Sequence, residues 1–226
     1  MSLTSGRGPL SGRPAGRFTT AVPDRTTYLE PHRRRVRGLK GGATVVDSER
    51  VVLVHRPGHP PVYAFPSADV DGVPAEAAPE APGYVTVDWD DADEWLEEDE
   101  RVFGHPRNPY HRVDCLRSHR HLVVILDGIT LVDTTSTLVV YETALDPRIY
   151  VEPRFVRTDL LETSSTQTYC PYKGTATYWS ARTGTDLFED IAWSYEDPRP
   201  ESLPLGRLLS FDDTRVEVRH DLPSAV

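Results

Sequence analysis

The sequence has little of what stabilises small secreted proteins or anchors a chain in a membrane. Only two cysteines, Cys115 and Cys170, occur in 226 residues, and no apolar run approaches the length of a membrane span. A chain of this length buries a sufficient core without disulfides, so we expect a reduced, cytoplasmic setting. The first twenty residues contain arginine and glycine but lack the apolar stretch of a secretory signal.

Motifs for common cofactors and metals are also missing. The chain has no Gly-x-Gly-x-x-Gly, no phosphate-binding loop, no Gly-x-Ser-x-Gly and no His-Glu-x-x-His. The cysteines form no Cys-x-x-Cys pair, and the acidic residues 88–100 do not follow a calcium-loop pattern. We therefore predict no metal site and no cofactor.

The charge is unevenly distributed along the chain. The net charge is -10, yet residues 1–39 hold eight arginines and only two acids. Nucleic acid is an improbable partner for the acidic remainder. The basic run at 32–37 could contact phosphates, but such a run more often docks on an acidic surface of its own protein or stays solvated.

An internal repeat is visible when the chain is aligned with itself at an offset of 86 residues. The alignment pairs Asp47 with Asp133, and one inserted residue then pairs Tyr63 with Tyr150. A tandem duplication of two domains follows.

The two copies differ in length. About 20 residues separate Pro66 from the closing strand of the first copy, against about 55 after Pro153 in the second. We predict an N-terminal arm at 1–32, a truncated first domain at 33–104 and a complete second domain at 105–226. A pocket built from the middle segment would be complete only in the second domain.

The secondary structure is expected to be mainly β. Short β-branched segments, an Asp-Gly turn at 127–128 and frequent proline and glycine predict a strand meander in each copy. Residues 89–103, with acids in the first turn, predict one helix that joins the domains and buries Trp95, Leu96 and Phe103.

A polar connector follows this predicted helix, at residues 105–121. It contains His105, Arg107 and Arg112 between prolines, so it is expected to be extended. Its arginines could bind a carboxylate or phosphate ligand, or could pair with the preceding acidic segment.

The densest chemical segment is residues 165–180, which include the motif Cys-Pro-Tyr-Lys-Gly. This turn brings the thiol of Cys170 close to the ammonium of Lys173, one of two lysines in an arginine-rich chain. Lys173 could bind an anionic or carbonyl group. The residue types alone are more typical of a solvated lysine and a buried structural cysteine.

Aromatic residues cluster nearby. Strand alternation places Tyr178 and Trp179 on opposite faces, and Trp193 and Tyr195 on the same face. Two rings on one face line a ligand cavity or fill a core.

Four segments together resemble a known bacterial family. They are CPYKGTATYWS, DIAWSYEDPRPE, YETALDPRIYVEP and WLEEDERVFGHPRNPYHRVD. The resemblance is to the domain of unknown function 427 family (DUF427), in tandem form over roughly residues 33–220. It implies β-tent (Mss4-like) domains akin to methionine sulfoxide reductase B and to the thalidomide-binding domain of cereblon, without their zinc cysteines. The motif positions that it implies are Glu142, Arg148, Tyr150, Cys170, Pro171, Tyr172, Lys173, Gly174, Trp193 and Tyr195.

These observations predict a small-molecule-binding module with its pocket in the second domain. The expected ligand-binding residues are Tyr172, Lys173, Tyr178, Trp193, Tyr195, Glu142, Arg148, Tyr150 and Cys170. One alternative is an enzyme that acts on a small organic substrate through Lys173 or Cys170. A second is a protein-interaction scaffold. No nucleic acid or membrane partner is expected.

Overall fold

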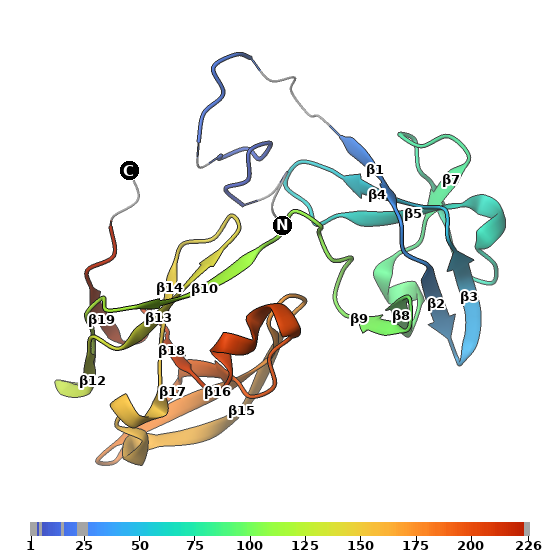
Figure 1. The fold of residues 1–226 in the computed structure, drawn as a ribbon. Coiled ribbons are helices and arrows are strands. Elements are labelled where there is room, and N and C mark those ends of the chain that lie inside the picture. Colours follow the sequence, from blue (N-terminus) through green and yellow to red (C-terminus); the bar gives the residue numbers. More distant parts are fainter. Residues whose placement is uncertain (1–3, 5, 15, 22–26, 224–226) are drawn as a thin grey trace. The chain divides into compact units, whose positions relative to one another are not determined.

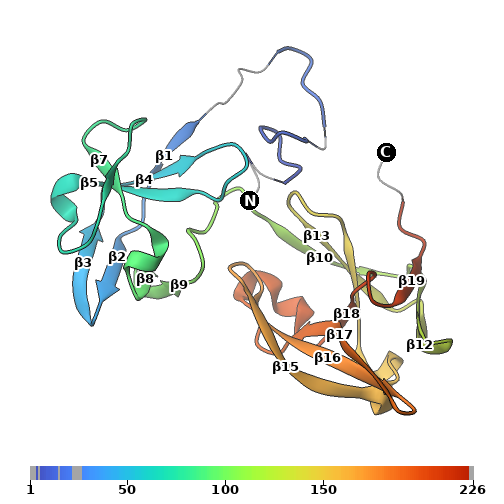
Figure 2. The same ribbon diagram turned by 180° about the vertical axis from the view of Figure 1, so that it is seen from behind.

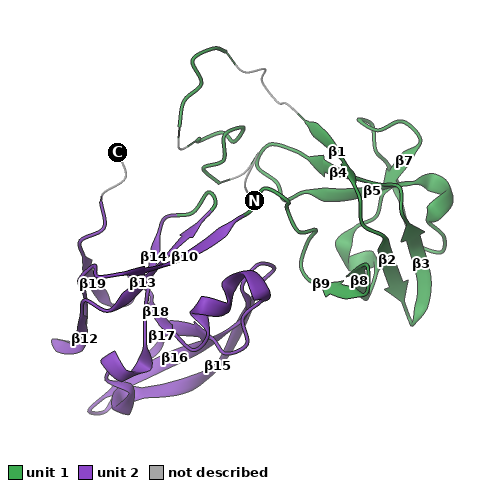
Figure 3. Cartoon of the chain, in the orientation of Figure 1, with its two compact units in different colours: residues 1–111, 143–145 green, residues 112–142, 146–226 purple. Residues whose placement is uncertain are grey.

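The structure, a computed structural model, describes residues 4, 6–14, 16–21 and 27–223. It is mainly β, which confirms the predicted class, and the helical segments among the described residues are short 3-10 turns (Figure 1). No helix in this part of the chain is long and apolar enough to span a membrane. The chain divides into unit 1, residues 1–111 with 143–145, and unit 2, residues 112–142 with 146–226 (Figure 3).

Unit 1 contains two antiparallel sheets. The first has the order β1 (Tyr28–His32), β4 (Val51–His55), β5 (Val62–Pro66), β7 (Tyr84–Thr86) and β6 (Glu76–Ala77). The second has the order β3 (Ala43–Ser48), β2 (Val36–Lys40), β8 (Glu94–Glu97) and β9 (Glu100–Val102), and the 3-10 turns are η1 (Ser67–Asp69) and η2 (Trp89–Asp91). Alternate apolar residues of both sheets form one core, among them Val36, Leu53, Phe65 and Trp95.

Unit 2 also contains two sheets, seen from opposite sides in Figures 1 and 2. The larger has the order β10 (Val113–Ser118), β13 (Thr137–Glu142), β14 (Arg148–Val151), β18 (Leu209–Phe211), β17 (Asp186–Tyr195), β16 (Gly174–Thr183) and β15 (Leu161–Cys170). The smaller has the order β12 (Ile129–Thr134), β11 (Leu122–Leu126) and β19 (Glu217–His220). The 3-10 turns are η3 (Pro153–Phe155), η4 (Thr158–Leu160) and η5 (Pro200–Leu205).

Strand pairing repeats between the units at the offset seen in the sequence. An isolated bridge joins Val46 to Val70 in unit 1 and Val132 to Val156 in unit 2, each 86 residues later. The order β1-β4-β5-β7 in unit 1 recurs as β10-β13-β14-β18 in unit 2. In the sequence, the long β15–β17 meander is inserted between β14 and β18, which are neighbours in the sheet. The corresponding stretch of unit 1 contains one strand, the two-residue β6.

The register corrects one detail of the repeat. Tyr63 lies opposite Leu53, and Ile149 lies opposite Val139, so the offset of 86 continues without an inserted residue. The structural counterpart of Tyr63 is therefore Ile149, not Tyr150.

The helix predicted over residues 89–103 was wrong. This stretch forms η2, β8 and β9, with Trp95 and Glu97 inward, and Phe103, which was expected to be buried, is 37% exposed. β8 pairs with β2, and groups in and just before β2 contact the acids: the backbone N–H of Arg35 donates to Glu98 Oε1, and Arg37 Nη2 donates to Asp99 Oδ1. Strand pairing thus satisfies the backbone hydrogen bonds of this segment. It also separates acidic side chains that would repel one another on a single helix.

The segment expected to be an N-terminal arm is partly structured. Its last five residues, Tyr28–His32, form β1 and pair along β4. The arginines that follow contact acids of unit 1 itself, as the pattern favoured: Arg34 binds Glu97, and Arg35 binds Asp47.

Candidate functional site

The Cys-Pro-Tyr-Lys-Gly turn connects β15 to β16 in unit 2 and is covered by η5. Ser202 Oγ donates to the carbonyl of Tyr172 at 3.1 Å, and the backbone N–H of Arg199 donates to that of Lys173 at 3.1 Å. Gly174 has a φ of +102°, and a Cβ there would lie 3.2 Å from the carbonyl oxygen of Asp197. Glycine is therefore required by conformation and by space.

Lys173 forms an ion pair with Glu142, at the end of β13. The two side chains are only 12% and 8% exposed. Burial lowers the pKa of Lys173, but the charge and hydrogen bond of Glu142, together with the charges of Cys170 and Tyr150, outweigh burial and raise the pKa overall. The amine is therefore protonated near neutral pH and is a poor nucleophile.

The expected aromatic residues of unit 2 gather on one face of the larger sheet. Trp193 lies opposite Tyr178 with ring centroids 6.5 Å apart, and its Nε1 donates to Tyr150 Oη at 3.0 Å. The Arg148 guanidinium carbon lies 5.8 Å from the Trp193 ring centroid. Trp179 packs in the core on the other face, as alternation predicted.

Two more of the expected side chains, Cys170 and Tyr195, pack in the same cluster, and Tyr172 is buried in the turn. Cys115, which the sequence patterns did not single out, packs in the cluster as well, and both cysteines are free thiols. Burial raises the pKa of the Cys115 thiol. Lys173 Nζ lies 5.9 Å from the centroid of the Tyr195 ring. The structure thus brings the predicted residues other than Tyr172 together, as a packed aromatic cluster with one ion pair.

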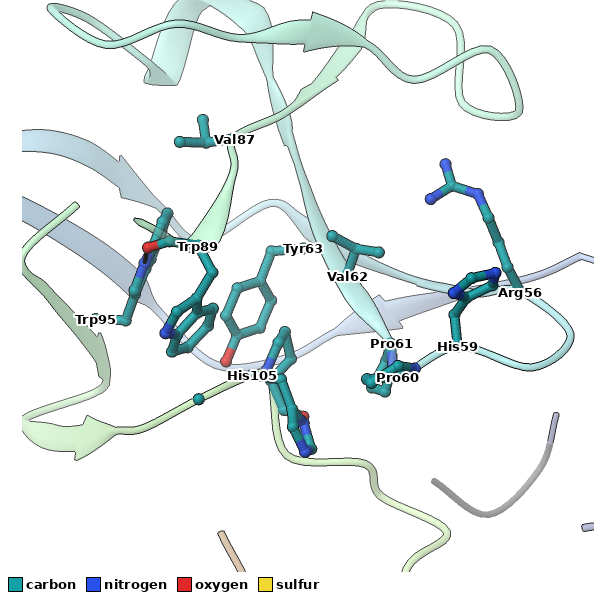
Figure 4. Close-up of a pocket in the computed structure, with 12 residues that line it drawn as sticks. Arg56, His59, Pro60, Pro61, Val62, Tyr63, Val87, Trp89, Trp95 and His105 are labelled. Carbon is teal, nitrogen blue, oxygen red and sulfur yellow. Dashed lines mark hydrogen bonds between the residues drawn. The ribbon is translucent and has the colours of Figure 1, made fainter. Parts of the chain in front are cut away.

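A cavity that the sequence patterns did not predict lies in unit 1 (Figure 4). Its volume is about 350 Å³. Its walls are Arg56, His59, Pro60, Pro61, Val62, Tyr63, Val87, Trp89, Trp95, Gly104, His105 and Pro106. These residues come from the β4–β5 loop, β5, the segment between β7 and β8, β8 itself and the chain after β9. The truncated copy therefore contains a concave site of its own, built from segments other than the middle segment that the sequence analysis considered.

Three rings form one wall of this cavity. Trp89 and Trp95 are stacked with centroids 5.4 Å apart and planes at 26°, and Tyr63 lies 6.4 Å from Trp89 at 29°. Trp95 Nε1 donates to the carbonyl of Trp89 at 2.9 Å, which ties η2 to β8. Trp95 is 2% exposed, whereas Trp89 is only partly buried. The buried Trp95 thus supports Trp89, which keeps part of its surface exposed.

A buried carboxylate holds Tyr63 in place. Tyr63 Oη donates to Glu97 Oε1 at 2.6 Å, Arg34 donates to Oε2, and His32 Nε2 lies 3.1 Å from Oε1. Burial raises the pKa of Glu97, but contacts with these three groups outweigh it and lower the pKa to about 2. Burial and the charge of Glu97 together raise the pKa of Tyr63. Tyr63 therefore remains protonated, with its proton directed at Glu97.

The polar groups at the mouth are largely compensated. Arg56 Nε and Nη2 donate to the two carboxylate oxygens of Glu80 at 3.0 and 3.1 Å. His105 Nδ1 lies 2.7 Å from the carbonyl oxygen of Pro106, and burial lowers the pKa of His105. A carbonyl can only accept, so Nδ1 carries the proton, and in the neutral ring Nε2 is an acceptor.

Comparison with known proteins gives a family without an assigned activity. The family model described as "Domain of unknown function (DUF427)" matches residues 28–87 and 114–221. No curated protein matches the chain. The matched ranges include Tyr63 and all the ligand-binding residues expected in unit 2, but not Trp89, Trp95 or His105. Among the described residues, no group of histidine, cysteine and acidic side chains could hold a metal ion.

Proposed function

This chain belongs to the DUF427 family, and we propose that it binds a small organic molecule in the cavity of unit 1. One observation carries the proposal: a hollow of about 350 Å³ lined by Tyr63, Trp89 and Trp95. Ligand sites in proteins are concave, mostly apolar, and typically about 300–1,000 Å³ in volume. A small number of polar groups fixes the ligand's orientation in such sites.

The duplication shows that two of the rings in the wall of this cavity have aliphatic counterparts in unit 2. The counterpart of Tyr63 is Ile149, and the counterpart of Trp95, which pairs with β2 at Gly38, is Val218. Both aliphatic residues pack in the core of unit 2. The fold is therefore shared, while the ring-lined wall is a property of the first copy.

The predicted residues of unit 2 remain a second candidate ligand site. The observation in its favour is the Arg148 guanidinium over the half-buried Trp193 ring, beside the Lys173–Glu142 pair. An enzyme that uses Lys173 as a nucleophile is less well supported, because Glu142 keeps the amine charged.

A fragment screen of uncharged one-ring and two-ring aromatic compounds tests the proposal, read by ligand-observed NMR and thermal shift. We compare the wild type with Trp89→Ala in the cavity and with Trp193→Ala in unit 2, a matched tryptophan truncation. Hits should stabilise the wild type and Trp193→Ala, and should lose affinity for Trp89→Ala. Loss only in Trp193→Ala would transfer the site to unit 2. A screen without hits, or hits that bind all three proteins equally, contradicts the proposal.

A further inference from the structure

We infer that the ligand of the unit 1 cavity is an uncharged, planar heteroaromatic molecule of up to two fused rings, whose N–H donates to His105 Nε2. This inference rests on the proposed function and specifies the chemistry of its ligand. Three observations support it: the tryptophan wall of the cavity, the ion pairs that neutralise its charged side chains, and the tautomer of His105.

The planar ring system of the ligand is inferred from the tryptophan wall of the cavity. Trp89 is backed by Trp95, so its position is fixed while part of its surface stays accessible at the cavity. A flat ring gains most from such a surface, because it can stack in an offset arrangement at little cost in conformational entropy. The volume of about 350 Å³ lies near the lower end of the range for ligand sites, which favours a compact molecule.

The absence of charge follows from the partners of the ionisable groups. The fork of Arg56 is taken by Glu80, and Glu97 is engaged by Tyr63 and Arg34. A ligand charge would lose its hydration in this apolar space, and Arg56, the charged side chain among the lining residues that the structure describes, is already paired with Glu80. Uncharged molecules are therefore favoured over carboxylates, phosphates and amines.

The donor follows from the acceptors that line the cavity. Tyr63 directs its proton at Glu97 and so offers oxygen lone pairs, and His105 uses its Nδ1–H for Pro106 and so offers Nε2. Trp89 and His105 both line the cavity, so a ligand that stacks on Trp89 would direct a ring N–H in its own plane to the histidine acceptor. A ligand without a donor would leave a desolvated acceptor unpaired.

Indole and 1-methylindole form a matched pair of probes, since they share a ring system and only indole has the N–H. In calorimetric titration, we expect the wild type to bind indole about 3- to 10-fold more tightly, the value of one neutral hydrogen bond. His105→Phe keeps a planar ring but removes the acceptor, so it should abolish the preference. His59→Phe, the same change at the exposed histidine of the mouth, should keep it.

A measurement on the wild type does not depend on variant folding. The ¹⁵N resonance of His105 Nε2 should shift on addition of indole and should stay in place with 1-methylindole. Equal affinity for both probes would overturn the inference and leave the proposed function standing. A preference that survives in His105→Phe, or an absence of binding by either probe, also overturns it, and the fragment screen then decides the proposed function separately.

Discussion

Glu97 should make unit 1 strongly sensitive to acid. Its pKa is about 2 in the folded protein against an ordinary value of 4.5, because the contacts with His32, Tyr63 and Arg34 outweigh the cost of burial. A difference of this size corresponds to about 3 kcal/mol of folding free energy, at about 1.4 kcal/mol per pKa unit. A lowered folded-state pKa contributes stability that is complete above the unfolded value. We therefore expect the contribution to be full above about pH 5 and to be lost as the pH falls from 4.5 to 2.

Urea unfolding at several pH values measures this contribution. In a background with Trp179→Phe and Trp193→Phe, fluorescence reports only Trp89 and Trp95 of unit 1. Between pH 5 and pH 2, the parent should lose about 3 kcal/mol more unfolding free energy than Glu97→Gln, while contributions from other carboxylates cancel in the comparison.

Tyr63→Phe provides a graded control for the same experiment. It removes one of the three contacts of Glu97, so its pH dependence should lie between those of the parent and Glu97→Gln. Parallel pH profiles for the parent and Glu97→Gln would refute the reasoning, because the carboxyl group would then have the same pKa in the folded and unfolded chains.

Two further predictions concern packing in each unit. Gly38→Ala places a Cβ 3.1 Å from the Trp95 ring and should destabilise unit 1 by about 1–3 kcal/mol in urea unfolding, whereas Gly12→Ala, with no atom within 4 Å, should be close to neutral. Lys173→Met leaves a buried Glu142 without its counter-charge and should lower the unfolding free energy of unit 2 by about 3–5 kcal/mol at pH 7. Adding Glu142→Gln should recover part of this loss. A loss below about 1 kcal/mol for the single variant would contradict a buried ion pair.

The acidic stretch at 89–103 shows how far a local pattern reaches. Its composition suits the first turns of a helix, and Glu94, Trp95, Leu96 and Glu97 do not alternate in polarity, although their side chains alternate in burial in the strand that they form. Arg37 of β2, more than fifty residues earlier in the chain, favours the strand because it donates a hydrogen bond to Asp99 beside the paired edge. Propensity was overridden by a tertiary partner that no local window contains.

The two candidate sites also differ in how far the sequence could predict them. The expected residues of unit 2 could be brought together from the sequence because most lie on adjacent strands of one meander, where alternation fixes their faces. The cavity of unit 1 depends on Tyr63, Trp89, Trp95 and His105, which lie on separate elements. The first copy does contain two tryptophans, a tyrosine and two adjacent prolines, and this aromatic content was the available signal. No local sequence pattern indicated that these residues enclose a cavity.

The sequence by itself determined the mainly β class, the repeat of 86 residues, the family and the opposite faces of Tyr178 and Trp179. These features depend on composition, on two-residue periodicity and on similarity between segments, all of which can be read along one chain. Only the tertiary structure decided that residues 94–102 form strands, that Lys173 is paired with Glu142, and that the shorter copy contains the hollow. Ion pairs and cavities are set by which side chains meet across strands distant in sequence, and that depends on packing in three dimensions.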